Sequence, residues 1–389
     1  LEDIAQANVL INGVEQLKES GQISDTEYHS YKAQGEIFRA LMMFRMARLW
    51  GSFPVITTIA QTITSDNINE VYPTYYPPRK SPKECYEQII ADLTDAEKYA
   101  PDNDNSDRTK MTKTVAQAML AKVYAEKEVQ DYDKVITYAD KVIKTTGVEL
   151  EDSYETLWGY DETTKDCLKR NTKEGILEVH WTTGGGNWET WMYGRQLDNW
   201  DYYFTWAKWI TPSRDIINDF EKEGDEIRKN QAIVYYACTW SNYYPASNYP
   251  FMYKLRSSYS NIYWIRLADI ILMKAEAEAY KGNLDESAKL VNQIRKRAKL
   301  KELTSDKTNS KEAMIEAVLH ERRLELAFEG ERWFDLCRNN KVEKYLNGID
   351  NRDKGRIKQV KLFDSNSYLL PIPQTALDQN TNLVQNPGY

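Results

Sequence analysis

Aromatic side chains gather in one stretch of this 389-residue chain, residues 184–209, which reads GGGNWETWMYGRQLDNWDYYFTWAKW. Indole and phenol rings combine an apolar face with a polar tip, so they suit surfaces that hold a flat, partly polar ligand. No helical or strand period fits the rings from Trp188 to Trp200, which disfavours an amphipathic core segment. The candidate contact residues are these rings and the polar groups between them: Trp188, Trp191, Arg195, Asp198, Asn199, Trp200, Tyr202 and Tyr203.

Packing against the rest of the chain is the alternative role for these rings. It is favoured for Trp206 and Trp209, which adjoin a predicted helix that starts near Ser213. For the other rings both roles stay open. Gly184, Gly185 and Gly186 lead into the stretch, but no phosphate-loop motif follows them.

Motifs of common catalytic and metal sites are missing from the sequence. His29, His180 and His320 are far apart, and no HExxH, GxSxG or Walker pattern occurs. The four cysteines form no CxxC pair and indicate neither a metal site nor a disulfide framework: Cys85, Cys167, Cys238 and Cys337. Residues 102–107 (DNDNSD) begin like a calcium loop but lack its glycine and its bidentate acid. We expect no cofactor, and weak calcium binding at this loop stays open.

Charge and hydropathy exclude two further classes. The formal net charge of −8 disfavours nucleic acid as a partner, because phosphate binding needs a concentrated basic surface. The chain has no apolar run of about 18 residues, so the sequence predicts no membrane-spanning helix. It starts at Leu1 without a basic and then apolar leader, so we expect any signal peptide to be absent or removed.

Helical patterns dominate the elements that must position the aromatic residues. Residues 36–49 are strongly apolar and Gly51 ends that helix, after which a proline-rich loop runs to Ser81. Ser81, Pro82 and Glu84 form a capping box that opens a helix to about residue 99. Residues 112–146 predict two helices with a turn at Gln130–Asp131, which is the pattern of a tetratricopeptide repeat.

A second helical pair spans residues 265–300, with Gly282–Asn283 at the turn, and a third helical block covers residues 311–340. Between the helical halves, residues 147–263 predict a short strand at 174–181, one brief helix at 212–228 and aromatic loops. Length alone is compatible with two or three domains. The patterns predict a mainly α fold that carries an irregular, ring-rich insert.

Charged residues in the segment HERRLELAFEGERWFDL, 320–336, call for partners. Glu321 shares a helical face with Val318 and Leu324, and a buried charge costs several kcal/mol unless it is paired. In a continuous helix, the spacing of Arg322 with Glu325, and of Glu329 with Arg332, supplies partners one turn away. A catalytic pair of carboxylates is the alternative role for this segment.

Six segments in the same order resemble the SusD/RagB family of starch-utilisation-type surface lipoproteins of Bacteroidetes. FRALMMFRMARLWGSFPV is similar to the family's "RA…Y…YGDVPL", and ERRLELAFEGERWFDL to its "ER..EL..EG.R..DL". The others are TKTVAQAMLAKVY, IRLADIILMKAEAEAYKG, VNQIRKRAKL and the closing LPIPQTALDQNTNLVQNPGY. The departures from the pattern, at Ser52–Phe53, Lys299 and Asn382, fall at turns and helix ends.

The resemblance implies a single domain with four tetratricopeptide-like helical pairs. Its parts are an N-terminal helical part (1–146), a ring-rich insert (147–263) and a C-terminal helical part with a tail (264–389). It also implies a non-catalytic protein that binds oligo- or polysaccharide on the outer face of the outer membrane. Such a protein is lipid-anchored through a cysteine upstream of Leu1, and it works as a lid on a SusC-like TonB-dependent transporter.

Sugars fit the aromatic residues because their C–H faces stack on rings while their hydroxyls reach polar neighbours. Family sites also use an aromatic residue from the loop after the apolar helix. Here that loop offers Tyr75 and Tyr76, with Arg79 nearby as a polar contact. Tyr243 lies in a similar proline-bounded segment. Two alternatives stay open: a glycoside hydrolase that uses acids such as Asp198 and Asp201, and a repeat scaffold that binds only protein.

Overall fold

Helices form most of the structure, a computed structural model that describes residues 1–389 except 162, 165, 182–210, 239–243, 257–258 and 354–357. The N-terminal elements are α1 (Glu2–Glu19), α2 (Asp25–Trp50), α3 (Ile68–Val71), the 3₁₀ helix η1 (Tyr72–Tyr75), α4 (Pro82–Tyr99), α5 (Lys113–Ala125) and α6 (Tyr132–Ile143). The middle of the chain contains α7 (Glu155–Trp158), β1 (Gly175–Val179), α9 (Arg214–Glu223), α10 (Glu226–Ala232), β2 (Ile233–Tyr236), η3 (Ala246–Asn248), β3 (Tyr249–Met252) and β4 (Ile262–Arg266). The C-terminal elements are α11 (Leu267–Lys281), α12 (Leu284–Arg297), α13 (Ser305–Thr308), α14 (Lys311–Glu325), α15 (Arg332–Arg338), α16 (Val342–Leu346), α17 (Ile349–Arg352), η4 (Ser365–Tyr368) and α18 (Gln374–Gln379).

Helix ends lie where the local sequence signals predicted them. Ser81 accepts a hydrogen bond from the Glu84 amide at 3.3 Å, and Glu84 accepts one from the Ser81 amide at 2.9 Å. This reciprocal pairing satisfies two amides that the start of α4 would otherwise leave unpaired. Gly51 ends α2 with a φ of 71°, a conformation that side chains with a Cβ rarely adopt. The predicted turn at Gln130–Asp131 is confirmed, since Asp131 caps α6.

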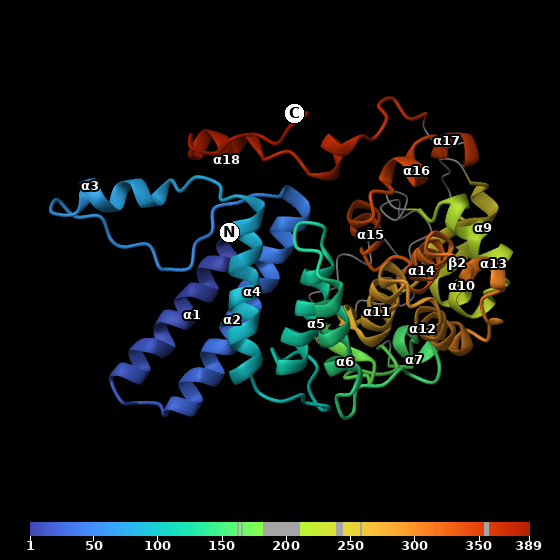
Figure 1. Ribbon diagram of the computed structural model, residues 1–389, viewed down its shortest axis with the longest axis horizontal. Helices are drawn as coiled ribbons and strands as arrows, with labels where there is room; N and C mark the ends of the chain where they lie inside the picture. Colours follow the sequence, from blue (N-terminus) through green and yellow to red (C-terminus); the bar gives the residue numbers. More distant parts are fainter. Residues whose placement is uncertain (162, 165, 182–210, 239–243, 257–258, 354–357) are drawn as a thin grey trace.

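The long helices pack on one another in sequence order, α1 on α2, α2 on α4, α4 on α5, α5 on α6, α6 on α11, and α11 on α12 and α14 (Figure 1). One apolar core runs through this stack from Ile4 in α1 to Leu319 in α14. Fully buried alanines, among them Ala118 and Ala275, let the helices approach closely. The mainly α fold is therefore confirmed, while the tetratricopeptide character of the pairs stays a prediction.

The described part of the chain contains two short antiparallel ribbons. β1 pairs with β4, which confirms the strand predicted at 174–181, and β2 pairs with β3. The single helix predicted at 212–228 is wrong, because the segment forms α9 and α10. Gly224 ends α9 with a φ of 68°, and Asp225 caps α10 by accepting a hydrogen bond from the Arg228 amide.

The charged segment 320–336 is not one helix, which corrects the sequence expectation. α14 ends at Glu325 and α15 begins at Arg332. Between them, Phe328 and Gly330 have φ values of 65° and 83°, so the backbone turns sharply there. Because of this interruption, Glu329 lies in the turn and not in a helix. Its ion-pair partner therefore does not follow from the one-turn spacing of a helix.

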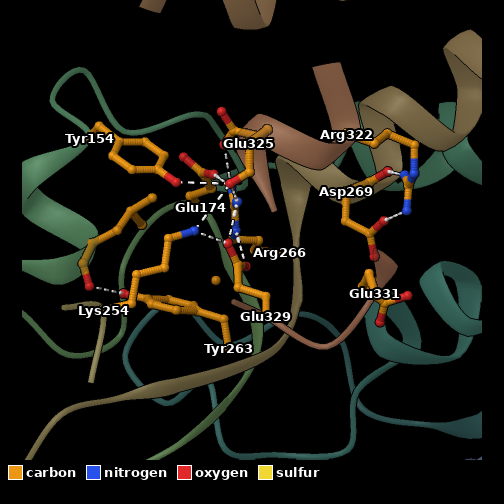
Figure 2. A network of polar contacts seen from close by, with 12 residues as sticks. Tyr154, Glu174, Lys254, Tyr263, Arg266, Asp269, Arg322, Glu325, Glu329 and Glu331 are labelled. Atoms are coloured by element: carbon orange, nitrogen blue, oxygen red, sulfur yellow. Dashed lines mark hydrogen bonds and ion pairs between the residues drawn. The ribbon is translucent and has the colours of Figure 1, made fainter. Parts of the chain in front are cut away.

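Buried charges meet at the C-terminal end of α14 (Figure 2). The Glu325 carboxylate is fully buried and lies 2.6 Å from Arg266 and 3.1 Å from Arg228, and it also pairs with Arg297. Arg266 in turn lies 2.8 Å from Glu174, just before β1. Burial alone would raise the pKa of Glu325, but the three guanidinium groups outweigh it and hold that pKa well below its ordinary value. The network thus joins β4, α10, α12 and α14 at one point.

The prediction that these charges are buried in pairs is confirmed, but the predicted partners were wrong. Arg322 pairs with Asp269 at 2.8 Å and Asp335 at 2.9 Å rather than with Glu325. Glu329 pairs with Arg266 at 2.6 Å rather than with Arg332. Glu321, with no exposed side-chain surface, lies 2.7 Å from Arg228 and 2.9 Å from Arg295. The carboxylates of this segment are therefore occupied by structural ion pairs.

Replacing Arg266 with methionine should lower the free energy of unfolding by about 3–5 kcal/mol, because it leaves buried carboxylates without a counterion. Urea denaturation measures the loss. Lys83→Met is the matched control, since Lys83 pairs with Glu87 at 3.7 Å while 83% exposed and its removal should change almost nothing. An equal effect of the two substitutions would contradict the structural role of the network.

Candidate functional site

A cleft of about 370 Å³ opens where the two helical halves meet the insert. Its walls come from α2, α5, α7, β4 and the turn that follows α14. The side chains that give it chemical character are Arg45, Trp158, Lys254, Asn261, Tyr263, Trp264, Glu329 and Glu331. Aromatic rings with a few polar groups are the usual lining of a small-molecule site in proteins.

Rings in the cleft are held in fixed orientations by their neighbours. The Arg45 guanidinium lies 4.4 Å from the centre of the Trp264 ring. Trp158 meets Tyr263 edge to face, with ring centres 5.1 Å apart and planes at 79°. Because the rings are already ordered, a ligand that stacks on them loses little conformational entropy.

Two buried polar atoms at the cleft have no hydrogen-bond partner in the part of the chain that the structure describes. They are the indole nitrogen Nε1 of Trp158 and the amide oxygen Oδ1 of Asn261. Their side chains belong to residues only 4% and 3% exposed, respectively. Leaving a buried donor or acceptor unpaired costs about 1–3 kcal/mol, so both side chains are held in place at a local cost in stability.

Lys254 lies in the wall of the cleft with its ammonium group almost fully buried. Its Nζ lies 2.5 Å from Glu329 and donates to the backbone oxygen of Glu325 at 3.2 Å. It also stands 4.6 Å from the centre of the Trp158 ring. Burial lowers the pKa of Lys254 to about 8, and the nearby Arg266 guanidinium adds to that effect. Figure 2 shows Lys254 between Tyr263 and the Glu325 end of the network.

The two carboxylates of the cleft are both tied to cations. Glu329 is shared by Lys254 and Arg266, and Glu331 lies 3.1 Å from Lys122 and 3.2 Å from Arg48. Within the described residues, both carboxylates of the cleft are therefore engaged by cations of the protein itself.

Most of the predicted contact residues fall outside the described residues, namely Trp188, Trp191, Arg195, Asp198, Asn199, Trp200, Tyr202, Tyr203 and Tyr243. Tyr75 is described, is 44% exposed, and its hydroxyl donates to the Gln61 backbone oxygen at 2.7 Å. The centres of the Tyr76 and Tyr72 rings lie 5.2 Å apart. These tyrosines form a small aromatic surface on the arm between α2 and α4, and they do not line the cleft.

Arg79 fastens the C-terminal tail to the scaffold. Its guanidinium donates to the backbone oxygens of Ser52, Trp50 and Val384 and, at 2.6 Å, to Oδ1 of Asn386. It also lines a larger cavity of about 620 Å³ beneath the tail. In Figure 1 the tail crosses above α4. No indole ring of the described residues lines that cavity, so the smaller cleft is the better candidate for a stacking ligand.

Trp158, Lys254, Asn261 and Trp264 were not expected from the sequence as site residues. They come from three segments, at positions 158, 254 and 261–264, which the fold brings to one cleft.

Acidic side chains of the loop at residues 102–107 bind neighbouring groups of the protein. Asp104 accepts a hydrogen bond from the Ser106 amide at 2.9 Å and pairs with Lys110 at 2.6 Å. Among the described residues, no group of three histidine, cysteine or acidic side chains is placed to hold a metal ion. In the same part of the chain, no helix has the length and apolar character that a membrane crossing requires.

Comparison with known proteins decides the family. A family model described as "SusD family" matches residues 96–389, which is most of the chain. The chain belongs to the SusD family. A second model, described as "Starch-binding associating with outer membrane", matches residues 2–125. The resemblance that the six sequence segments indicated is thus confirmed.

Relatives of this SusD family member span almost its whole length. It is 27% identical to SusD-like protein P2 of Formosa agariphila, over 99% of this chain and 79% of that protein. It is 26% identical to a SusD-like protein of Bacteroides ovatus, over 90% and 67% of the two chains.

Solved structures share its fold. A SusD superfamily protein of Parabacteroides distasonis superposes with a TM-score of 0.77 at 24% identity, over 99% of this chain and 83% of that one. A laminarin-binding SusD-like protein superposes with a TM-score of 0.73 at 23% identity, over 99% and 84% of the two chains.

Lys254 should make stability depend on pH in the alkaline range. Its pKa is about 8 in the fold and near 10.5 in the unfolded chain, so between these values the unfolded chain binds more protons. The free energy of unfolding of the wild type should therefore rise with pH across this window, relative to Lys254→Met, by roughly 3 kcal/mol. Urea denaturation from pH 7.5 to 10.5 measures the difference, with Lys83→Met as the flat control. A constant difference across the window would mean that Lys254 titrates normally.

Proposed function

We propose that this SusD family member binds oligo- or polysaccharide without catalysis, at the outer face of the outer membrane, and delivers it to a SusC-like TonB-dependent transporter. Family membership supports the proposal, as does the fold shared with a laminarin-binding protein. The outer-membrane association in the description of the second family model agrees with the location.

The observation that carries the proposal is the Trp264 ring in a cleft that polar side chains also line. A sugar can stack its C–H face on the indole. Its hydroxyl groups can pair with the polar side chains of the same cleft, such as Arg45 and Asn261. Few other ligand classes supply an apolar face and several hydroxyl groups together.

The ring-rich stretch remains part of the proposal as a second platform beside the described residues. Its proposed contacts are Trp188, Trp191, Arg195, Asp198, Asn199, Trp200, Tyr202 and Tyr203. Tyr75, Tyr76, Arg79 and Tyr243 are proposed as further contacts for a longer glycan, with Arg79 acting mainly through the tail that it holds.

The transporter contact is proposed for the arm between α2 and α4, which projects from the helical stack in Figure 1. Exposed apolar side chains follow this arm: Ile59, Ile63 and Ile68. An exposed apolar run on a folded protein commonly marks a protein interface. The lipid anchor upstream of Leu1 is proposed from the family alone.

Glycan binding should fall about tenfold or more in Trp264→Ala, Trp191→Ala and Trp200→Ala, because each removes a stacking surface. Affinity electrophoresis in gels with plant, host and microbial polysaccharides measures the loss, and melting temperatures report on folding. Tyr31→Ala is the control, since Tyr31 is a ring on α2 that is 46% exposed and lies outside the cleft. Unretarded migration of the wild type in every glycan would favour a scaffold that binds only protein. A large fall in melting temperature with binding intact would assign that ring to packing.

Incubation of the protein with any glycan it binds should release no new reducing ends, since the cleft carboxylates are held in ion pairs. A reducing-sugar assay over many hours checks this. New ends that disappear in Asp198→Asn or Asp201→Asn would identify a glycoside hydrolase instead.

A further inference from the structure

Two adjoining cavities, of about 290 and 320 Å³, lie on the C-terminal half of the molecule. They share Asp215, Arg323, Arg332 and Tyr345. Their walls come from α9, α14, α15, α16 and α17, so they are distinct from the cleft beside β4. Phe328, in the turn after α14, borders both the cleft and the 290 Å³ cavity.

Basic groups outnumber acids in the 320 Å³ cavity. Its basic residues are His320, Arg323, Arg332, Lys344 and Arg352. Its acids are Asp215 and Asp219, and both of them pair with Arg323. Asp215 also lies 3.6 Å from Arg352. The acids are therefore already occupied, in a protein whose overall charge is −8.

Arg332 lines the same cavity, and neither of these two acids forms an ion pair with it. Its Nη1 donates to the Leu319 backbone oxygen at 3.0 Å, and its guanidinium lies 4.8 Å from the centre of the Tyr345 ring. No ion pair joins Arg332 to a carboxylate within the described residues. Within the described residues, its Nε and Nη2 make no hydrogen bond or ion pair. Burial lowers the pKa of Arg332 to about 10, and repulsion from Arg323 adds to that effect.

We propose that this cavity binds an oxyanion, a sulfate, phosphate or carboxylate group, with Arg332 as its principal ligand. Guanidinium groups bind such anions through two parallel N–H bonds, and Nε and Nη2 of Arg332 are placed on one edge for this. Lys344 and Arg352, which are 56% and 43% exposed, stand at the rim, where Lys344 lies 2.6 Å from Glu316 and Arg352 lies 3.6 Å from Asp215. A bound anion removes the cost of an uncompensated guanidinium.

The anion is carried as a substituent on a sugar, an inference that rests on the proposed function. The 290 Å³ cavity continues from Arg332 with apolar side chains, Ile216, Phe328, Leu346 and Ile349. These side chains suit the body of a molecule that is attached to the anionic group. A glycan with sulfate esters or uronic acids has this chemistry, whereas a free inorganic ion would use only Arg332 and its basic neighbours.

Titration calorimetry on the whole chain tests the proposal in two arms at constant ionic strength. One arm uses sodium sulfate and sodium phosphate. The other uses sulfated and uronic acid oligosaccharides, each beside its neutral counterpart. The wild type should bind at least one anionic probe, and the anionic oligosaccharides roughly tenfold or more tightly than the neutral ones.

Arg332→Gln should abolish this preference, while Lys289→Gln should leave it unchanged. Lys289 is a lysine on α12 that is 76% exposed, and its substitution removes the same charge from the protein. Should Arg332→Gln fail to fold, Lys344→Gln and Arg352→Gln replace it, and each should weaken anion binding several-fold.

Binding of the anionic oligosaccharides that is lost in the Arg332 variant supports the site and a sugar source. Binding of inorganic sulfate or phosphate alone, lost in the same variant, supports the oxyanion site and overturns the sugar source. Equal binding by Arg332→Gln and the wild type, or no binding of any anion, overturns the site. Neutral glycans bound through Trp264 should be unaffected by Arg332→Gln, so failure here is distinguishable from failure of the proposed function.

Discussion

Glu325 is the carboxylate on which the arrangement of the molecule depends. It ends α14 in a position without solvent, and it is compensated by Arg228, Arg266 and Arg297 from three other elements. A buried charge of this kind is tolerated only when its partners keep their geometry, so the network fixes how α10, β4, α12 and α14 meet. The turn after α14 continues the network through Glu329 to Lys254, and this contact holds one wall of the cleft.

Local signals made much of the fold predictable from the sequence. The capping box of Ser81 with Glu84, the glycine at position 51 and the turn at Gln130–Asp131 depend on residues close in sequence, and all are confirmed. The partners of the buried charges were beyond such reasoning. Arg322 pairs with Asp269, 53 positions away, and with Asp335, which lies beyond the turn that follows α14.

The site was predictable only in its chemistry. Aromatic abundance indicated a stacking surface, but Trp158 and Trp264 come from segments far apart in the sequence, and the fold brings them to one cleft. Arg79 is an example in which the neighbours in the sequence differ from the contacts in the structure. It stands near tyrosines in the sequence, yet its side chain binds Asn386, 307 positions later, and so organises the tail. Contacts between distant segments decide both assignments.

A crystal structure of the chain with the glycan that it retains most strongly would test the central claim most directly. A sugar ring is expected against Trp264, with hydroxyl groups at about 3 Å from polar side chains of the cleft such as Arg45 and Asn261. Sugar bound elsewhere on the protein, with the cleft empty, would contradict the assignment of this cleft as the binding site.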